Sequence, residues 1–211
     1  MDALPQQVEI EPLPMPLRWL GRPRAWSSDA DRLAITAGPA TDWFVDPGGP
    51  TSLSDSSAGD FSNAPALVGR PSGDFLLSAR VRPDFASTFD AGVLLLHGDE
   101  RRFAKFCFEY SPQGKPMVVS VVTRGVSDDC NSFSVEGREV WLRVARIGDC
   151  FAFHASTDGS FWRMVRYFTL DAAASMEVGF EAQSPTGEGC SVSFDEIRFE
   201  ARTLGDLRNG E

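Results

Sequence analysis

Short segments in which apolar and polar residues alternate recur at regular intervals between residues 103 and 199. Two of these segments flank the turn sequence at residues 147–149, and a third follows the turn sequence at residues 156–160. Successive residues of a β-strand point to opposite faces, and tight turns join neighbouring antiparallel strands. The pattern therefore predicts an antiparallel β-sandwich or barrel.

The strands are expected at ten places along the chain. They are residues 32–37, 74–82, 90–97, 103–111, 116–123, 139–147, 150–157, 161–168, 175–183 and 190–200. Helical periodicity never extends beyond two turns, and residues 170–175 alone are expected to form a short helical turn. Residues 127–132 are interpreted as an edge loop of the sandwich. An all-β fold follows.

A chain of 211 residues suits one large β domain better than two small ones. We place that domain at residues 17–201. Residues 1–16 contain four prolines, which favours an extended arm on the domain surface. Residues 45–74 are rich in Gly, Pro, Ser and Asp, and we interpret them as a long structured loop of the kind that often borders a binding site. The polar tail at 202–211 is expected to fray.

Charge and composition limit the partners, the location and the cofactors that we expect for this protein. The 30 acidic and 20 basic residues give a net charge of −10, which disfavours nucleic acid and membrane surfaces as partners. The N-terminus lacks a signal-peptide pattern, so a cytoplasmic location is expected. Cysteine and histidine spacing fits no zinc site, and we predict no cofactor and no metal. Calcium binding by Asp128, Asp129 and Asn131 is the weaker interpretation, because turn-forming side chains explain this sequence more simply. The oligomeric state stays open.

Alternation separates the faces of three central strands. One face of each is apolar, and the residues expected to be buried there are Ala104, Phe106, Phe108, Tyr110, Leu142, Val144, Val178, Phe180 and Ala182. The opposite faces carry isolated charges among apolar or small residues: Lys105, Glu109, Arg143 and Glu181, with Trp141. A solvated face would be denser in charge and a buried face would exclude it, so we predict a semi-enclosed groove for a polar ligand. An ordinary surface sheet with cross-strand ion pairs is an equally strong interpretation.

Carboxylate, amide and aromatic groups together are typical of sugar-binding sites, in which a ring stacks on the apolar sugar face. Gln183 and Ser184 close a strand with an amide and a hydroxyl, and Trp43, Phe44 and Trp141 are candidate stacking platforms. The predicted ligand-binding residues are Trp43, Lys105, Glu109, Thr123, Ser127, Asp128, Trp141, Arg143, Glu181, Gln183 and Ser184.

Several motifs together resemble one known family. They are TDWF (41–44), FDAGVLL (89–95), KFCFEYS (105–111), VVSVVTRGVSDD (118–129), WLRVAR (141–146) followed by F-x-x-S-x-D-G-x-x-W, and VGFEAQSPTGEGCSVSFDEIRF (178–199). This combination resembles the regulation-of-enolase family, over almost the whole domain. The resemblance implies a concanavalin A-like lectin/glucanase fold, a jelly-roll sandwich of two curved antiparallel sheets whose distant relatives bind or cleave glycans on the concave face. It also implies a link to galactose-responsive control of enolase expression, and it supplies no catalytic residues.

Glycoside cleavage on such a fold usually requires two carboxylates on one strand, in a pattern resembling E-x-D-x-x-E, and this chain lacks that pattern. Glu109 and Glu181 could form a non-standard pair, although Lys105 and Arg143 are expected to keep both ionised, which suits binding better. We therefore expect non-catalytic binding of a carbohydrate or a small polar metabolite on the concave face. The alternatives are a glycoside hydrolase or lyase that uses Glu109 and Glu181, and a regulatory protein-interaction domain that uses the arm and the 45–74 loop.

Overall fold

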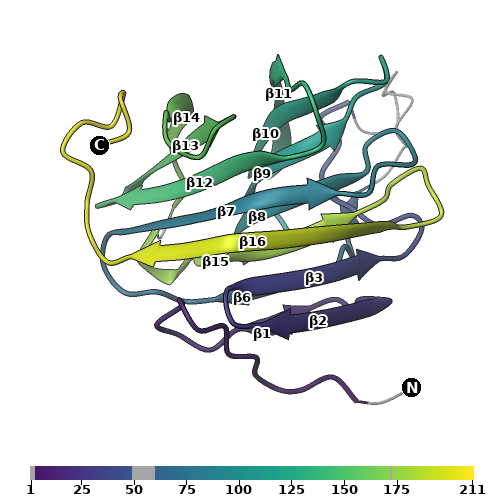
Figure 1. Cartoon of the computed structure of the whole chain (residues 1–211), viewed down its shortest axis with the longest axis horizontal. Coiled ribbons are helices and arrows are strands. Elements are labelled where there is room, and N and C mark those ends of the chain that lie inside the picture. Colours follow the sequence, from purple (N-terminus) through teal and green to yellow (C-terminus); the bar gives the residue numbers. More distant parts are fainter. Residues whose placement is uncertain (1–2, 49–59, 172) are drawn as a thin grey trace.

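The computed structural model describes residues 3–48, 60–171 and 173–211. Its strands form two seven-stranded sheets packed face to face, which Figure 1 shows one behind the other. Neighbouring strands in both sheets pair antiparallel. The all-β prediction is therefore confirmed, and the arrangement is consistent with a jelly-roll sandwich.

The first sheet has the strand order β1-β6-β15-β8-β9-β10-β11. In that order its strands are Arg18–Leu20, Ala66–Gly69, Glu177–Gln183, Ala91–Asp99, Arg102–Tyr110, Pro116–Arg124 and Val126–Ser134. The second sheet has the order β14-β13-β12-β7-β16-β3-β2. Its strands are Arg163–Thr169, Cys150–Ser156, Val140–Ile147, Phe75–Pro83, Cys190–Glu200, Arg32–Ala37 and Ala25–Asp29. A short ribbon pairs β4 (Trp43–Phe44) with β5 (Phe61–Ser62), and the 3-10 helix η2 (Ala173–Ser175) precedes β15.

The main core lies between the two sheets. Phe106 of β9 stacks on Phe153 of β13 with ring centroids 4.7 Å apart, and Phe180 of β15 lies 5.2 Å from Phe194 of β16. The residues that alternation assigned to this core are in the cluster: Ala104, Phe106, Phe108, Leu142, Val144, Val178, Phe180 and Ala182, with Tyr110 packed against it at its edge. Because each contact joins the two sheets, the residues on the opposite faces of the same strands must point outward.

All ten predicted strands are present, and the short helical turn at 170–175 corresponds to η2. The loop predicted at 127–132 is wrong, because these residues belong to β11, the edge strand of the first sheet. Most side chains of β11 are exposed and polar. A strand of this kind lacks the alternation of apolar and polar residues by which a strand is recognised, so its sequence resembles that of a loop. The 45–74 segment contains β5 and the fully buried β6, while its residues 49–59 lie outside the described part.

The last two strands lie within the sheets rather than at their edges. β15 pairs with β6 and β8, and β16 pairs with β3 and β7. Gly179 permits the close approach of β15 to β6, because a Cβ at this position would collide with the carbonyl oxygen of Leu67. This topology places β15 beside β8, so its outward side chains come near those of β9.

The segments that flank the sandwich pack onto it. Val8 and Leu17 exchange backbone hydrogen bonds of 2.8 Å, and Ile10 is buried with them, so the arm contributes to the core as well as lying over the surface. The tail differs from the fraying that we expected, since Leu204 is buried against the outer face of the second sheet. Within the described residues, no helix is long and apolar enough to cross a membrane.

Candidate functional site

The outer face of the first sheet places Lys105 at its centre. Lys105 on β9 lies opposite Leu95 of β8 and Val121 of β10, and Asp129 of β11 follows Val121 in the same row. Directly paired residues of an antiparallel sheet point to the same face. Lys105 and Asp129 therefore share one face with Glu109, which is four residues from Lys105 on the same strand.

Residues 41–48, which we call the cover segment, lie over this face. The cover segment is attached to β15 by the hydrogen bond from Thr41 N–H to the carbonyl of Ser184, 3.3 Å long. It is attached to β11 through Val45, whose N–H donates to Ser127 Oγ at 2.9 Å and whose carbonyl accepts from the Ser127 N–H at 2.8 Å. Between these attachments the cover segment brings Asp42 above the sheet.

Lys105 is almost completely buried beneath the cover segment and forms the centre of a polar network. Its Nζ donates to Asp42 Oδ1 at 2.5 Å and to Gln183 Oε1 at 2.9 Å. Burial alone lowers the pKa of Lys105, but the nearby negative charges, chiefly that of Asp42, outweigh burial and raise this pKa above its usual value. Lys105 is thus a charged group held in a fixed position by two partners.

This network lies at a small pocket of about 50 Å³. The pocket is lined by Asp42, Phe44, Phe89, Lys105, Glu109, Val121, Asp129 and Gln183. We call it the Lys105 pocket. A volume of this size holds one or two water-sized groups, so it can admit only one end of a larger ligand.

Three predicted residues meet in the Lys105 pocket: Lys105, Glu109 and Gln183. The expectation that neighbouring cations keep Glu109 and Glu181 ionised is wrong, because burial raises the pKa of each carboxyl to about 8 despite Lys105. Glu109 therefore keeps its proton at neutral pH and can donate a hydrogen bond as well as accept one.

Glu181 lies next to the Lys105 pocket but does not line it. Its side chain is completely buried, and neither carboxyl oxygen has a hydrogen-bond partner among the described residues. Glu181 lies opposite Val93 of β8, which in turn lies opposite Cys107 of β9, so two strand spacings separate it from Glu109's strand. Glu109 and Glu181 are therefore not a pair of carboxylates facing each other across an open groove.

Trp141 and Arg143 do not belong to this site, so the prediction of one groove containing them is wrong. Both residues lie on β12 in the second sheet and point outward on the opposite side of the sandwich. Trp141 Nε1 donates to Glu196 Oε2 at 3.1 Å, and the guanidinium of Arg80 lies 5.4 Å from its ring centroid. Alternation separates inward from outward residues of a strand, but it does not indicate which sheet the strand joins.

Asp128 is also displaced from the predicted site. It points to the face of β11 opposite Asp129 and forms an ion pair with Arg166 at 2.9 Å, with 65% of its side chain exposed. The neighbouring residues Thr123 and Ser127 do face the site, yet their hydroxyls bond each other at 2.9 Å and hold the cover segment. These two hydroxyls therefore support the pocket wall and do not line the pocket.

Trp43 and Ser184 also support the pocket from behind. Trp43 is 4% exposed, its Nε1 donates to the carbonyl of Ala64, and its ring packs edge-on against Phe103, so it offers no stacking surface. Ser184 Oγ donates to the buried Asp90 at 2.6 Å. Phe44, the residue after Trp43, is the ring of the cover segment that lines the pocket.

Sequence reasoning did not select Asp42, Phe89 and Asp129 for this site. Asp129 could have been found by alternation, since it lies two residues after Ser127 on the same face. Phe89 has a φ of 68°, an unfavourable value for a bulky residue, and is held there by hydrogen bonds from its N–H to the Tyr110 carbonyl and from Gln183 Nε2 to its own carbonyl. No sequence pattern predicts such a strained position.

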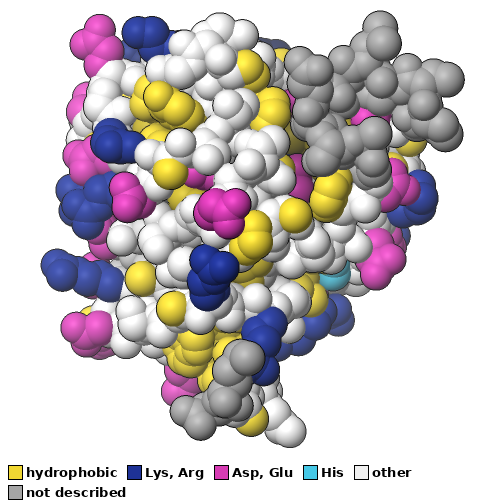
Figure 2. Space-filling view, turned by 90° about the vertical axis from the view of Figure 1, so that its right-hand side faces the viewer, with side chains coloured by type: hydrophobic (Ala, Val, Ile, Leu, Met, Phe, Trp, Pro, Cys, Tyr) yellow, Lys and Arg dark blue, Asp and Glu magenta, His cyan; other side chains and the backbone are white. Residues whose placement is uncertain are grey.

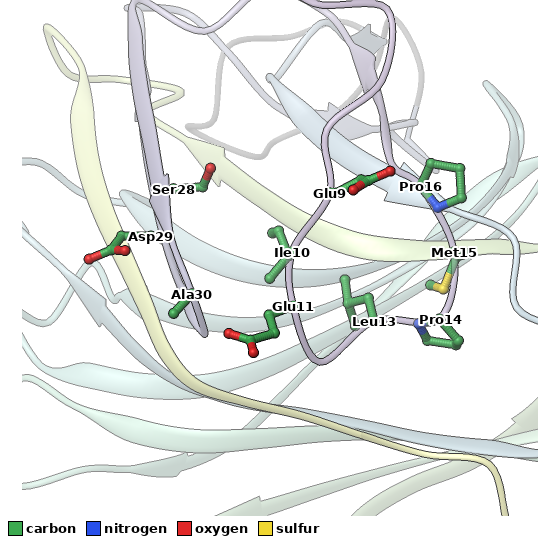
Figure 3. A pocket seen from close by; sticks show the side chains of 10 residues that line it. All are labelled: Glu9, Ile10, Glu11, Leu13, Pro14, Met15, Pro16, Ser28, Asp29 and Ala30. Carbon is green, nitrogen blue, oxygen red and sulfur yellow. The ribbon is translucent and has the colours of Figure 1, made fainter.

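Other hollows lie outside this network. A groove of about 620 Å³ lies between residues 9–16 and residues 28–30 at the end of β2. Figure 3 shows the side chains that line it. Its lining combines apolar side chains such as Ile10 and Leu13 with the carboxylates of Glu9 and Glu11, and it contains none of the predicted site residues. In the described part of the chain, no group of three or more His, Cys, Asp or Glu residues is placed to hold a metal ion.

The two sheets and the outer-face pocket define a β-sandwich protein with a polar network beneath a cover segment. The chain belongs to the family described as protein of unknown function (DUF1349), whose model matches residues 19–202. No curated protein matches the sequence.

Solved structures share the fold at low sequence identity. A functionally unknown protein from Saccharomyces cerevisiae is 24% identical with a TM-score of 0.79, covering 90% of this chain and 97% of that one. The K247S mutant of the GH43 protein BlXynB from Bacillus licheniformis is 14% identical with a TM-score of 0.65, over 88% of this chain and 37% of that one. A xylan β-1,4-xylosidase from Bacillus halodurans C-125 is 12% identical with a TM-score of 0.62, over 95% and 40% respectively. This chain spans less than half of either enzyme, so both comparisons establish the β-sandwich fold alone.

Proposed function

We propose that this protein is a non-catalytic module that binds a carbohydrate, or a similar small polyhydroxylated metabolite, at the Lys105 pocket. The observation that carries the proposal is the buried Lys105, held by Asp42 and Gln183 at the base of a pocket with Glu109 beside it. Sugar hydroxyls both donate and accept hydrogen bonds, and they suit a site that offers an ammonium, an amide and carboxyl groups together.

The aromatic rings at this pocket support a sugar over other polar ligands. Phe44 and Phe89 line the pocket and are half-buried, so part of each ring is accessible to the apolar face of a sugar. The small volume favours entry of one edge of a sugar ring, with the rest of the ligand outside. Several acidic groups surround a single ammonium, which favours a neutral ligand over an anionic one.

The surface charge supports the same ligand class. Figure 2 shows acidic and basic side chains interspersed at one end of the sandwich, without an extended basic area among the coloured residues in view. A nucleic acid partner requires such an area. The resemblance to the regulation-of-enolase family adds galactose as the first sugar to test, and a cytoplasmic location remains part of the proposal.

A glycoside hydrolase or lyase is the second candidate, and the protonated state of Glu109 favours it. A carboxyl whose pKa is raised to about 8 can act as a general acid at neutral pH. Its partner would be Asp129 or Asp42, which line the same pocket, because Glu181 is closed off from it. Binding remains the stronger proposal, since both candidate partners lie close to the Lys105 ammonium, and Asp42 is bonded to it. A regulatory protein-interaction domain has no comparable side-chain network among the described residues to support it.

Isothermal titration calorimetry with galactose, xylose, arabinose and their oligosaccharides tests the proposal. Asp129→Asn should weaken binding about ten-fold or more, as expected for loss of a charge-assisted hydrogen bond. Glu109→Gln should weaken it by a smaller factor, because a protonated carboxyl makes neutral hydrogen bonds that the amide partly replaces. Asp128→Asn is the matched control, because it changes the adjacent carboxylate on the opposite face of β11 and should bind as the wild type does.

Wild-type affinity in Asp129→Asn, or no binding of any saccharide by the folded wild type, would refute the site. Release of reducing sugar by the wild type but not by Glu109→Gln would replace the binding proposal with the catalytic one.

A further inference from the structure

The tail folds back over the outer face of the second sheet, opposite to the Lys105 pocket. Figure 1 shows this segment turning back beside β12 and β13. Leu204 and the half-buried Leu207 pack with Leu76, Ala145 and Ala152. Most other side chains of the tail are exposed, so its apolar contact with the sheet is small.

Three side chains form a socket around Gly210 of the tail: Arg143 of β12, His154 of β13 and Trp162. Arg143 Nη2 donates to the Gly210 carbonyl at 2.7 Å, and His154 Nε2 lies 2.8 Å from the Leu207 carbonyl. Gly210 has a φ of 80°, and a Cβ there would collide with Arg143 Nη2 and lie 3.0 Å from Trp162 Cβ. The socket therefore holds bare backbone, and a side chain at this position would be strained by the positive φ and would displace the Arg143 guanidinium from the Gly210 carbonyl.

The tail does not provide hydrogen-bond partners for all the buried nitrogen atoms of the socket. Arg143 is 5% exposed and His154 is completely buried, yet Arg143 Nε and His154 Nδ1 have no hydrogen-bond partner among the described residues. The Arg143 guanidinium lies 4.3 Å from the Trp162 ring centroid. Burial lowers the pKa of Arg143 to about 10 and that of His154 to about 4, so at neutral pH the socket holds one guanidinium charge and a neutral imidazole. The Gly210 carbonyl is the neutral partner of this buried cation, and a neutral acceptor is a weaker partner for a cation than an anion is.

We propose that the tail covers a second binding site, in which Arg143 and His154 take a carboxylate monoanion in place of the Gly210 and Leu207 carbonyls. A carboxylate matches the single positive charge of the socket and offers two oxygens to two donors. A phosphate dianion is disfavoured, because the socket itself has one cation, and the nearby charges of Arg202 and Glu200 are of opposite sign. The carboxylate can belong to an acidic sugar or to a small organic acid, which share this chemistry.

Gly210→Ala provides the test, because backbone strain and displacement of the Arg143 guanidinium weaken the seat of the tail without changing the socket residues. Gly205→Ala is the matched control, since a Cβ there would lie 3.6 Å from the Glu211 carbonyl oxygen, an ordinary contact. Leu207→Asp is a second releasing variant that removes the apolar contact instead. Circular dichroism establishes that each variant is folded, and trypsin cleavage after the exposed Arg208 reports tail release.

Sodium glucuronate and sodium acetate are then titrated into each protein by calorimetry, with galactose and inorganic phosphate as comparison ligands. We expect the two releasing variants to bind a carboxylate about ten-fold more tightly than the wild type and Gly205→Ala do, because the tail no longer competes. Binding of acetate as well as glucuronate identifies the carboxylate alone as the ligand group, whereas binding of glucuronate only identifies an acidic sugar. Arg143→Gln in the released background should abolish binding of both.

Three results would overturn the inference. One is trypsin resistance of Gly210→Ala and Leu207→Asp equal to that of the wild type, which would mean that the tail is not displaceable. The second is a released tail with no carboxylate binding, which would make the socket a structural clamp. The third is phosphate binding as tight as carboxylate binding. None of these results bears on the Lys105 pocket, which lies on the other sheet.

Discussion

Glu181 should make the stability of this protein depend on pH in a way that a single substitution removes. Its carboxyl is completely buried without a hydrogen-bond partner among the described residues, and burial raises its pKa from 4.5 to about 8. Between these two values the folded protein holds a proton that the unfolded chain has released. The stabilising contribution is therefore fully present below pH 4.5 and is lost as the pH rises through the folded pKa.

The size of the effect follows from this pKa shift. Each pH unit inside the window lowers the free energy of unfolding by about 1.4 kcal/mol per shifted group. Between pH 5 and pH 7.5, Glu181 alone should lower it by roughly 3 kcal/mol. Glu181→Gln cannot ionise, so its stability should fall less steeply with pH than that of the wild type. Glu109 remains in both proteins, and its contribution differs between them only through the charge of Glu181, the smallest of the influences that raise its pKa.

Urea unfolding followed by tryptophan fluorescence, at half-unit steps from pH 5 to pH 7.5, measures these slopes. The two proteins should be close in stability at pH 5, and Glu181→Gln should be the more stable one at pH 7.5. The exposed Glu136→Gln is the control and should follow the wild-type curve. Parallel curves for Glu181→Gln and the wild type would show that the buried carboxyl does not retain its proton, and the reasoning would be wrong.

Two further substitutions test the backbone of the fold. Gly179→Ala should lower the free energy of unfolding by more than about 3 kcal/mol, because its Cβ would collide with the Leu67 carbonyl between β15 and β6. Gly38→Ala is the control in the same urea titration, because a Cβ at residue 38 meets no neighbouring atom. Equal losses of stability in both variants would contradict the close approach of the two strands. Ala30→Gly should raise the stability by up to about 1 kcal/mol, because Ala30 has a φ of 49° that glycine adopts without strain. Calorimetry should show a small rise in Tm, and an unchanged or lower Tm would count against strain at this turn.

The inward faces of the strands were predictable because alternation is a local property. Phe106, Leu142 and Phe180 each lie in the core, as the period of two requires. The assignment of strands to sheets was not predictable, because it depends on pairings between residues far apart in the chain. Arg143 and Lys105 look equivalent along their strands, yet they point to opposite sides of the sandwich.

The candidate site was predictable only where regular strands contribute to it. Lys105 and Glu109 come from such a strand, but β11 resembles a loop, and a shift of one residue exchanges Asp128 for Asp129. Asp42 reaches the site through the cover segment, whose path is set by hydrogen bonds to β11 and β15. Irregular segments carry no periodicity, so their position over a sheet has to be observed.

The central positions of β15 and β16 have a consequence for biosynthesis. Each strand joins two neighbours in the middle of its sheet, and those neighbours are made much earlier on the ribosome. Until residues 177–200 emerge, β6 and β8 lack the strand between them, as do β3 and β7. Folding of both sheets therefore has to wait until residues 177–200 have been made, and nascent chains would expose apolar strand edges during that time, which makes them substrates for chaperones.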